Sequence, residues 1–127
     1  MIILKVEPGK VPQRMEITGD LTSMQQVVGG NIQAVYPFQD LPFALVCHEE
    51  GKLIGLPLNR ALRDDAGEMY DVIAGTFFLC GAPPEEETFT GLSEEQLQIA
   101  ERRFHTPELF LRMNGRLIPI PVIPPEA

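Results

Sequence analysis

Asparagine and arginine side chains that could recognise an anion stand together in the stretch LPLNRALR, residues 56–63. Arg60 and Arg63 are the only guanidinium groups between residues 41 and 100, and Asn59 precedes them at the end of an apolar run. A guanidinium group can hold a carboxylate or a phosphate through two parallel hydrogen bonds. One interpretation of this stretch is therefore a binding site for an anionic group.

The same residues also have an ordinary structural interpretation. The amide of Asn59 can satisfy backbone groups of a loop that would otherwise be buried without partners. The two arginines can pair with carboxylates that follow them in the chain, namely Asp64, Asp65 or Asp71. The sequence leaves both interpretations open.

The sequence gives little support for a metal site or for nucleophilic catalysis. His48 lies beside two glutamates, but adjacent residues on a turn rarely converge on one ion, and no second pair of ligands has zinc-type spacing. His105 is explained by its place at the C-terminal end of a helix. Cys47 and Cys80 each sit in an apolar run, which predicts reduced thiols in the core. We expect no metal, no cofactor and no nucleophilic catalysis, and an enzyme of unknown reaction stays only a secondary hypothesis.

The elements that must position these residues follow from periodicity and turn chemistry. Gly75 lies inside the most apolar run, which predicts a central strand with a bulge or a close backbone approach at the glycine. The NRALR stretch could add one helical turn. The expected elements are a hairpin over 2–18, a helix from Asp20 to Gly29, a strand over 32–36, a hairpin over 41–58, a strand over 71–81, a helix over 93–104 and a hairpin around Asn114–Gly115.

Strands that cluster rather than alternate with helices predict an α+β fold, a mainly antiparallel sheet with two helices packed on one face. A length of 127 residues predicts a single domain over 1–127. Its proline-rich segment 120–127 should form an edge strand or a frayed tail.

The chain is acidic, with a net charge of −8, and residues 41–100 hold eleven carboxylates against three basic side chains. This balance disfavours direct binding to nucleic acid, whose phosphates attract basic surfaces. No apolar run has the length of a membrane span, and the first residues do not read as a signal peptide. We therefore expect a cytoplasmic protein without a membrane partner.

Three motifs, VVGGNIQAVYPF, EEGKLIGLPLNRAL and DVIAGTFFLCG, occur in an order and spacing that resemble the bacterial and phage family of domain of unknown function 3846. The resemblance runs from about residue 5 to residue 104. It implies an origin in bacteria, their mobile elements or phages, and leaves the activity open. The motif positions that it implies are Gly29, Gly30, Tyr36, Leu56, Asn59, Ala61 and Gly75.

These observations support two functional hypotheses. The first is a non-catalytic module that binds a protein partner through its acidic face and the LNRAL strand end. The second is a pocket that binds or sequesters a nucleotide-like small anion. The candidate binding residues for either are Tyr36, Asn59, Arg60, Arg63, Asp71 and Gly75.

Overall fold

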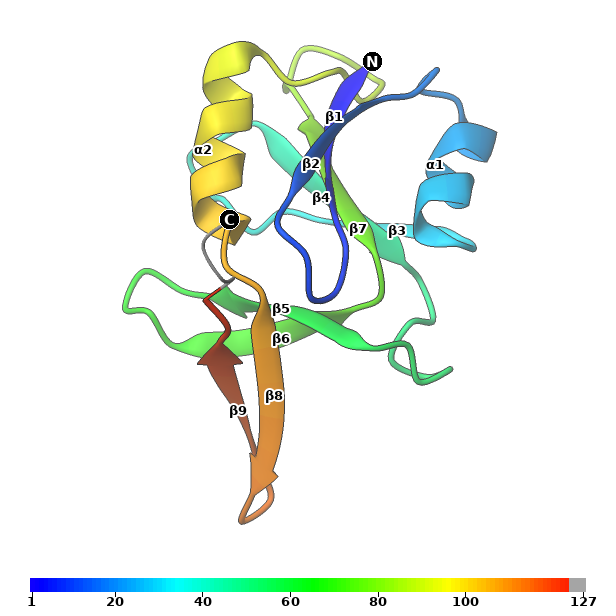
Figure 1. Ribbon diagram of the computed structural model, residues 1–127. Helices are drawn as coiled ribbons and strands as arrows, with labels where there is room; N and C mark the ends of the chain where they lie inside the picture. Colours follow the sequence, from blue (N-terminus) through cyan, green and yellow to red (C-terminus); the bar gives the residue numbers. More distant parts are fainter. Residues whose placement is uncertain (124–127) are drawn as a thin grey trace.

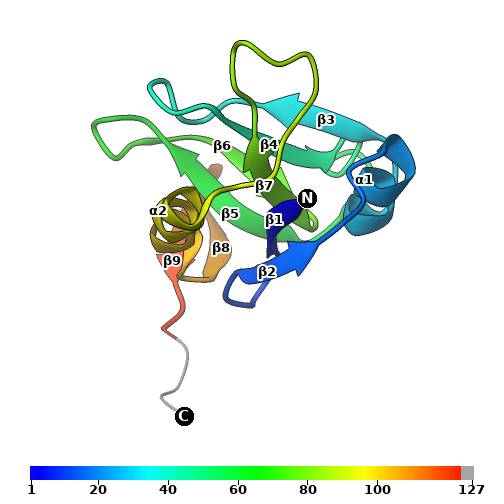
Figure 2. The same ribbon diagram turned by 90° about the horizontal axis from the view of Figure 1, so that it is seen from above.

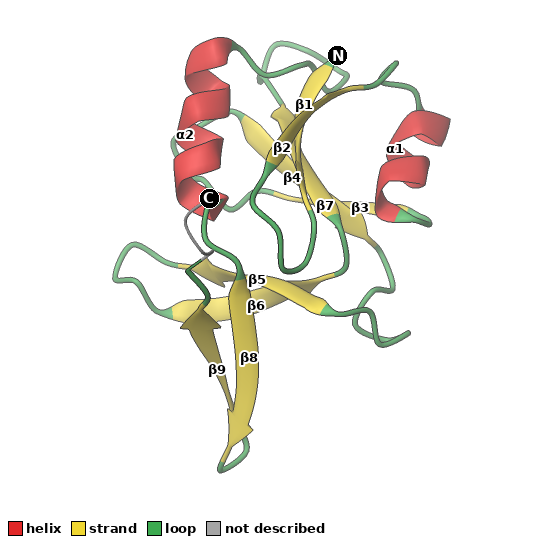
Figure 3. Ribbon diagram, in the orientation of Figure 1, coloured by secondary structure: helices red, strands yellow, loops and turns green. Residues whose placement is uncertain are grey.

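The computed structural model describes residues 1–123 of the chain, and its elements form one five-stranded sheet, two two-stranded sheets and two helices (Figures 1 and 3). In chain order they are β1 (Ile2–Val6), β2 (Gln13–Glu16), α1 (Leu21–Val28), β3 (Ile32–Val35), β4 (Phe43–His48), β5 (Leu58–Arg63), β6 (Met69–Ala74), β7 (Phe77–Gly81), α2 (Glu94–Phe104), β8 (Glu108–Met113) and β9 (Arg116–Pro121). All described strand pairs are antiparallel, which confirms the predicted α+β class.

The large sheet has the strand order β2-β1-β7-β4-β3, so β7 is its middle strand. Leu79 of β7 lies between Leu4 of β1 and Leu45 of β4, and all three side chains are fully buried. The predicted central position is thus confirmed for residues 77–81. The prediction of one strand over 71–81 is wrong, because the chain turns at Gly75 (φ +83°) and passes from β6 in one sheet to β7 in another.

The two helices lie on opposite faces of the large sheet, and the prediction that both cover one face is wrong (Figures 1 and 2). Side chains alternate along a strand, so β4 sends Phe43 and Leu45 to one side and Ala44 and Val46 to the other. The first side holds the core that α2 covers, and the second holds the core that α1 covers. Strands buried on both faces explain why the apolar runs of β4 and β7 are continuous.

The predicted hairpin over 41–58 is also wrong, because β3 and β7 already occupy both edges of β4. Residues 49–55 form a run of turns, and the NRALR stretch lies in strand β5 instead of a helical turn. β5 pairs with β6 across the turn at 64–67, where the carboxylate of Asp64 accepts hydrogen bonds from the backbone N–H groups of Ala66 and Glu68.

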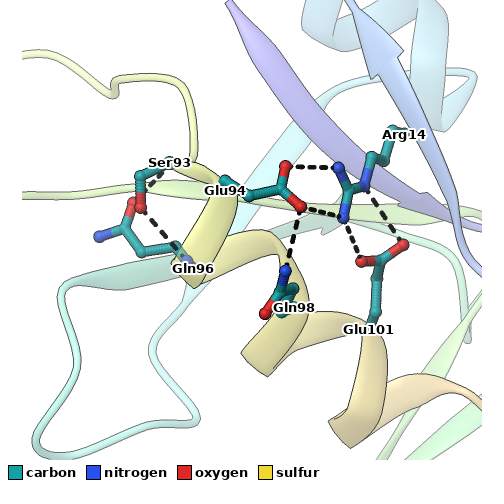
Figure 4. Close-up of polar contacts among 6 residues, drawn as sticks. All are labelled: Arg14, Ser93, Glu94, Gln96, Gln98 and Glu101. Atoms are coloured by element: carbon teal, nitrogen blue, oxygen red, sulfur yellow. Dashed lines mark hydrogen bonds and ion pairs between the residues drawn. The ribbon is translucent and has the colours of Figure 1, made fainter.

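Local signals in the sequence predicted both helix starts correctly. Asp20 accepts a hydrogen bond from the Ser23 N–H at the start of α1, and Ser93 and Gln96 form a reciprocal capping box at the start of α2. Figure 4 shows the capping box beside Arg14 of β2, whose guanidinium group contacts both Glu94 and Glu101 of α2 at 2.6–3.3 Å. These contacts join the exposed strand β2 to the helix.

β8 and β9 form the predicted hairpin around Asn114 and Gly115, which both have positive φ angles, as a tight two-residue turn requires. The hairpin extends away from the large sheet and from both helices (Figure 1). β9 ends at Pro121 and pairs with β8 on one side only. Residues 124–127 of the segment predicted as an edge or tail lie outside the described part.

Candidate functional site

Asn59 and Arg60 are both buried, with 0% and 1% of their surface exposed. The amide of Asn59 donates hydrogen bonds to the carbonyl oxygens of Val6 (2.9 Å) and Gly75 (2.8 Å). Its own oxygen accepts a hydrogen bond from the guanidinium group of Arg60 (2.9 Å). Asn59 thus joins β1, β5 and the turn between β6 and β7, as the structural interpretation requires.

Arg60 holds two further segments together. Its Nε donates to the carbonyl oxygen of Phe104 at the end of α2 (3.0 Å), and its Nη2 donates to the carbonyl oxygen of Lys10 (2.6 Å). A cation that bonds the last carbonyls of a helix complements the helix dipole. Burial lowers the pKa of the Arg60 guanidinium, and the carboxylate of Glu108 partly offsets this effect. The LNRAL strand end is therefore closed to a partner, and the prediction that it forms a contact surface is wrong.

Arg63 pairs with a carboxylate that the sequence did not single out. Its Nη2 lies 2.8 Å from Glu108 of β8, whose side chain is only 7% exposed and also accepts from the Ala61 N–H. The expected pairing of the arginines with Asp64, Asp65 or Asp71 is absent from the described residues, because β8 crosses β5 and brings Glu108 closer.

The remaining candidate residues lie apart from one another. Asp71 forms an ion pair with Lys52 on an exposed part of the surface. Gly75 meets the side chain of Leu56, and a Cβ atom placed on it would lie 2.7 Å from the Leu56 Cδ1. The close approach expected at this glycine therefore exists in the structure, with a leucine of the same chain as the neighbour.

Tyr36 and Arg63 do come together, in a groove of about 920 Å³. It lies between the connection of β3 to β4 and the turn of β5 to β6, on the side of the molecule that carries α2 (Figure 2). Three aromatic rings, two arginines and three aspartates line this groove. The residues of this groove used below are Tyr36, Phe38, Asp40, Arg63, Asp64, Asp65, Tyr70 and Arg103.

Arg103 is the basic residue of this groove that the sequence did not identify. Its guanidinium carbon lies 5.3 Å from the centre of the Phe104 ring, and that ring packs edge-on against Phe38 (6.1 Å between centroids). Within residues 1–123, its guanidinium group has no hydrogen bond or ion pair. Partial burial lowers the pKa of Arg103, and the positive charge of Arg63 lowers it further.

The helical periodicity of α2 could have indicated the position of Arg103. Ala100 and Phe104 face the core, so a residue three positions after Ala100 lies at the border of the buried stripe. Arg103 was not among the candidate residues predicted from the sequence. Its border position turns the side chain into the groove, where Tyr36 and Tyr70 expose 61% and 56% of their surfaces.

The other residues considered for chemistry have structural surroundings. Cys47 and Cys80 are free buried thiols, as predicted, and burial raises the pKa of Cys80 to about 12. His48 accepts a hydrogen bond from the Glu50 N–H through its Nδ1. No group of three potential metal-binding side chains occurs in the described part of the chain.

Comparisons with known proteins give one match. The model of a family described as "Domain of unknown function (DUF3846)" matches residues 1–105, which include the groove and all elements from β1 to α2. No curated protein and no solved structure matches the chain. None of the helices described between residues 1 and 123 is long and apolar enough to span a membrane.

Proposed function

The chain belongs to this family, the domains of unknown function 3846, and we propose that it is a non-catalytic module whose groove binds a segment of a protein partner. The observation that carries the proposal is the Arg103 guanidinium group, which has no partner within residues 1–123 and lies in a groove with two exposed tyrosines. Arginine and tyrosine are the residue types that dominate binding energy at protein interfaces. The cellular setting we propose is the cytoplasm of a bacterium that carries the domain itself or on a mobile element or phage.

The charges of the groove indicate the kind of segment. Arg103 offers a bidentate contact to a carboxylate of the partner, while Asp40 and Asp65 offer contacts to a basic side chain. Asp64 is occupied with the backbone of its own turn. A segment that presents an acidic residue close to a basic one, with an apolar or aromatic residue between them, fits this arrangement.

One observation favours a second candidate, a small anion with a planar part. The cation of Arg103 lies among aromatic rings, and this combination also suits a nucleotide-like molecule. The aspartates around it oppose a multiply charged phosphate, so the mixed-charge peptide remains our first choice.

Selection of peptides from a random displayed library on the purified protein tests the proposal. Selected peptides should carry the mixed-charge pattern and should lose at least tenfold in affinity for the Arg103→Gln variant. The matched control is Arg102→Gln, because Arg102 is the exposed neighbour on the same helix turn and does not line the groove. Tyr36→Ala should weaken the same peptides, and raised salt should weaken all of them.

Three results distinguish the alternatives. Peptides that bind Arg103→Gln as tightly as the wild-type protein refute the groove as their site. Native mass spectrometry of the protein from its own cells that shows a bound small molecule, released on denaturation, supports the second candidate. Covalent change of such a molecule during incubation refutes a purely binding role.

A further inference from the structure

The hairpin of β8 and β9 carries an apolar face that nothing in the described structure covers. Side chains of directly paired residues in an antiparallel hairpin point to the same side. Leu109 is paired with Ile120, Leu111 with Ile118 and Met113 with Arg116, so Arg116 shares this side at the turn end of the hairpin. The five apolar side chains expose between 37% and 61% of their surfaces, and we call them the outer face of the hairpin.

The opposite face of the hairpin is already in use. Phe110, Leu117 and Pro119 alternate with the residues of the outer face and are partly buried, and β8 contacts β5. Glu108 at the base of the hairpin accepts hydrogen bonds from Arg63 and from the backbone of β5. The hairpin is thus held on the body by its inner face, and its outer face is oriented away from that body.

Another strand cannot pair fully with the free edge of β9. Pro119 and Pro121 have no N–H group, and a proline fits a paired strand only where its nitrogen faces the free edge. That edge therefore lacks two of the donors that another strand would need. A partner on this element is expected to pack against the side chains of the outer face.

We propose that a second copy of this chain packs on the outer face, so that two hairpins meet face to face across a twofold axis. The face is apolar apart from Arg116 at its turn end, so two copies related by a twofold axis can pack their five apolar side chains together, as a symmetric dimer contact requires. Arg112 and Arg116 are the two exposed charged residues of the hairpin, and both are basic. The net charge of −8 therefore comes from the rest of the chain. The hairpin extends from the body of the molecule (Figure 1), so the proposed contact joins two copies through their hairpins instead of through their acidic bodies.

The size of the outer face agrees with a weak dimer. Its five side chains expose roughly 500 Å² per chain, at the upper end of the largest patch on an ordinary monomer. Complete burial of this face in both copies would remove at most roughly 1,000 Å² from solvent, which only reaches the lower limit for a specific interface. We therefore expect a dimer that dissociates on dilution through the micromolar range.

Sedimentation equilibrium of the full chain between about 1 and 300 µM tests this inference. The wild-type protein should pass from monomer to dimer, and Leu111→Glu should remain monomeric. At about 1 µM, where the wild-type protein is monomeric too, the two thermal midpoints should agree, because the substituted side chain is exposed. The control is Leu53→Glu, which places the same charge at a leucine that is 87% exposed in the loop before β5. This control should dimerise like the wild-type protein.

A cysteine variant tests the same contact in a way that does not depend on whether Leu111→Glu folds. Ile118→Cys lies at the centre of the outer face, so oxidation should link two copies through this position, while the buried Cys47 and Cys80 stay unreacted. A wild-type protein that is monomeric at 300 µM overturns the inference. A dimer that Leu111→Glu does not dissociate, or that Ile118→Cys does not crosslink, also overturns it.

Discussion

Replacement of Asn59 by alanine should destabilise the protein severely, because all its side-chain hydrogen bonds are buried. The change removes the donor that serves the carbonyl oxygens of Val6 and Gly75 and the acceptor that serves the guanidinium group of Arg60. Each buried polar group that loses its partner costs about 1–3 kcal/mol. Three such groups predict a loss of about 3–9 kcal/mol, a large share of the roughly 5–15 kcal/mol that holds an ordinary domain together.

Urea unfolding followed by circular dichroism measures this loss. With a slope of about 2 kcal/mol per M urea, the midpoint of Asn59→Ala should fall by roughly 2 M or more. Asn31→Ala is the matched control, because Asn31 is exposed and its change should leave the midpoint nearly constant.

Asn59→Asp separates hydrogen bonding from packing. It preserves the shape of the side chain but turns a carboxylate oxygen toward two carbonyl oxygens, so it should destabilise at least as much as alanine. A midpoint for Asn59→Ala within about 0.5 M of the wild-type value would refute the structural role assigned to this residue.

Three further outcomes are expected. In urea titrations, Gly75→Ala should lower the free energy of unfolding by about 1–3 kcal/mol more than Gly67→Ala. Both glycines have positive φ angles, but only the Cβ added at Gly75 meets a side chain, the Leu56 Cδ1 at 2.7 Å. Hydrogen bonds from Arg14 hold the pKa of Glu94 below its usual 4.5. This pair therefore stabilises the folded protein above about pH 4.5, and the stabilisation is lost as the pH falls. The melting temperature of Arg14→Gln should depend less on pH between pH 5 and pH 2 than that of the wild-type protein. Cys80, with its pKa raised to about 12, should react with a chromogenic disulfide reagent at pH 8 only after unfolding, and fast labelling of the native protein would contradict its burial.

Features that depend on near neighbours in the chain could be predicted from the sequence. The Asp20 cap, the Ser93–Gln96 capping box and the Asn114–Gly115 turn each need only residues within one turn, so their chemistry is complete in a short window. The central position of β7 followed from its continuous apolar run, because only a strand covered on both faces needs one.

Features that depend on distant contacts could not be predicted. The acceptors of Arg60 lie 44 and 50 residues away in the chain, so no local pattern could show that its side chain is buried. The pairing of β4 with β7 and the placement of the helices on opposite faces depend in the same way on how remote strands meet. The groove was found in part: Tyr36 and Arg63 were candidates, whereas Arg103 was not.

The strand order of the large sheet has a consequence for synthesis on the ribosome. β1 is made first and pairs on one side with its neighbour β2, but its other side waits for β7, which is the last strand of that sheet to be made. β4 also has one edge open until then, although its side chains are almost all apolar. Until residue 81 has left the ribosome, the nascent chain exposes two unpaired apolar edges of the kind that aggregate or recruit chaperones. The middle strand therefore closes the sheet in a single late step.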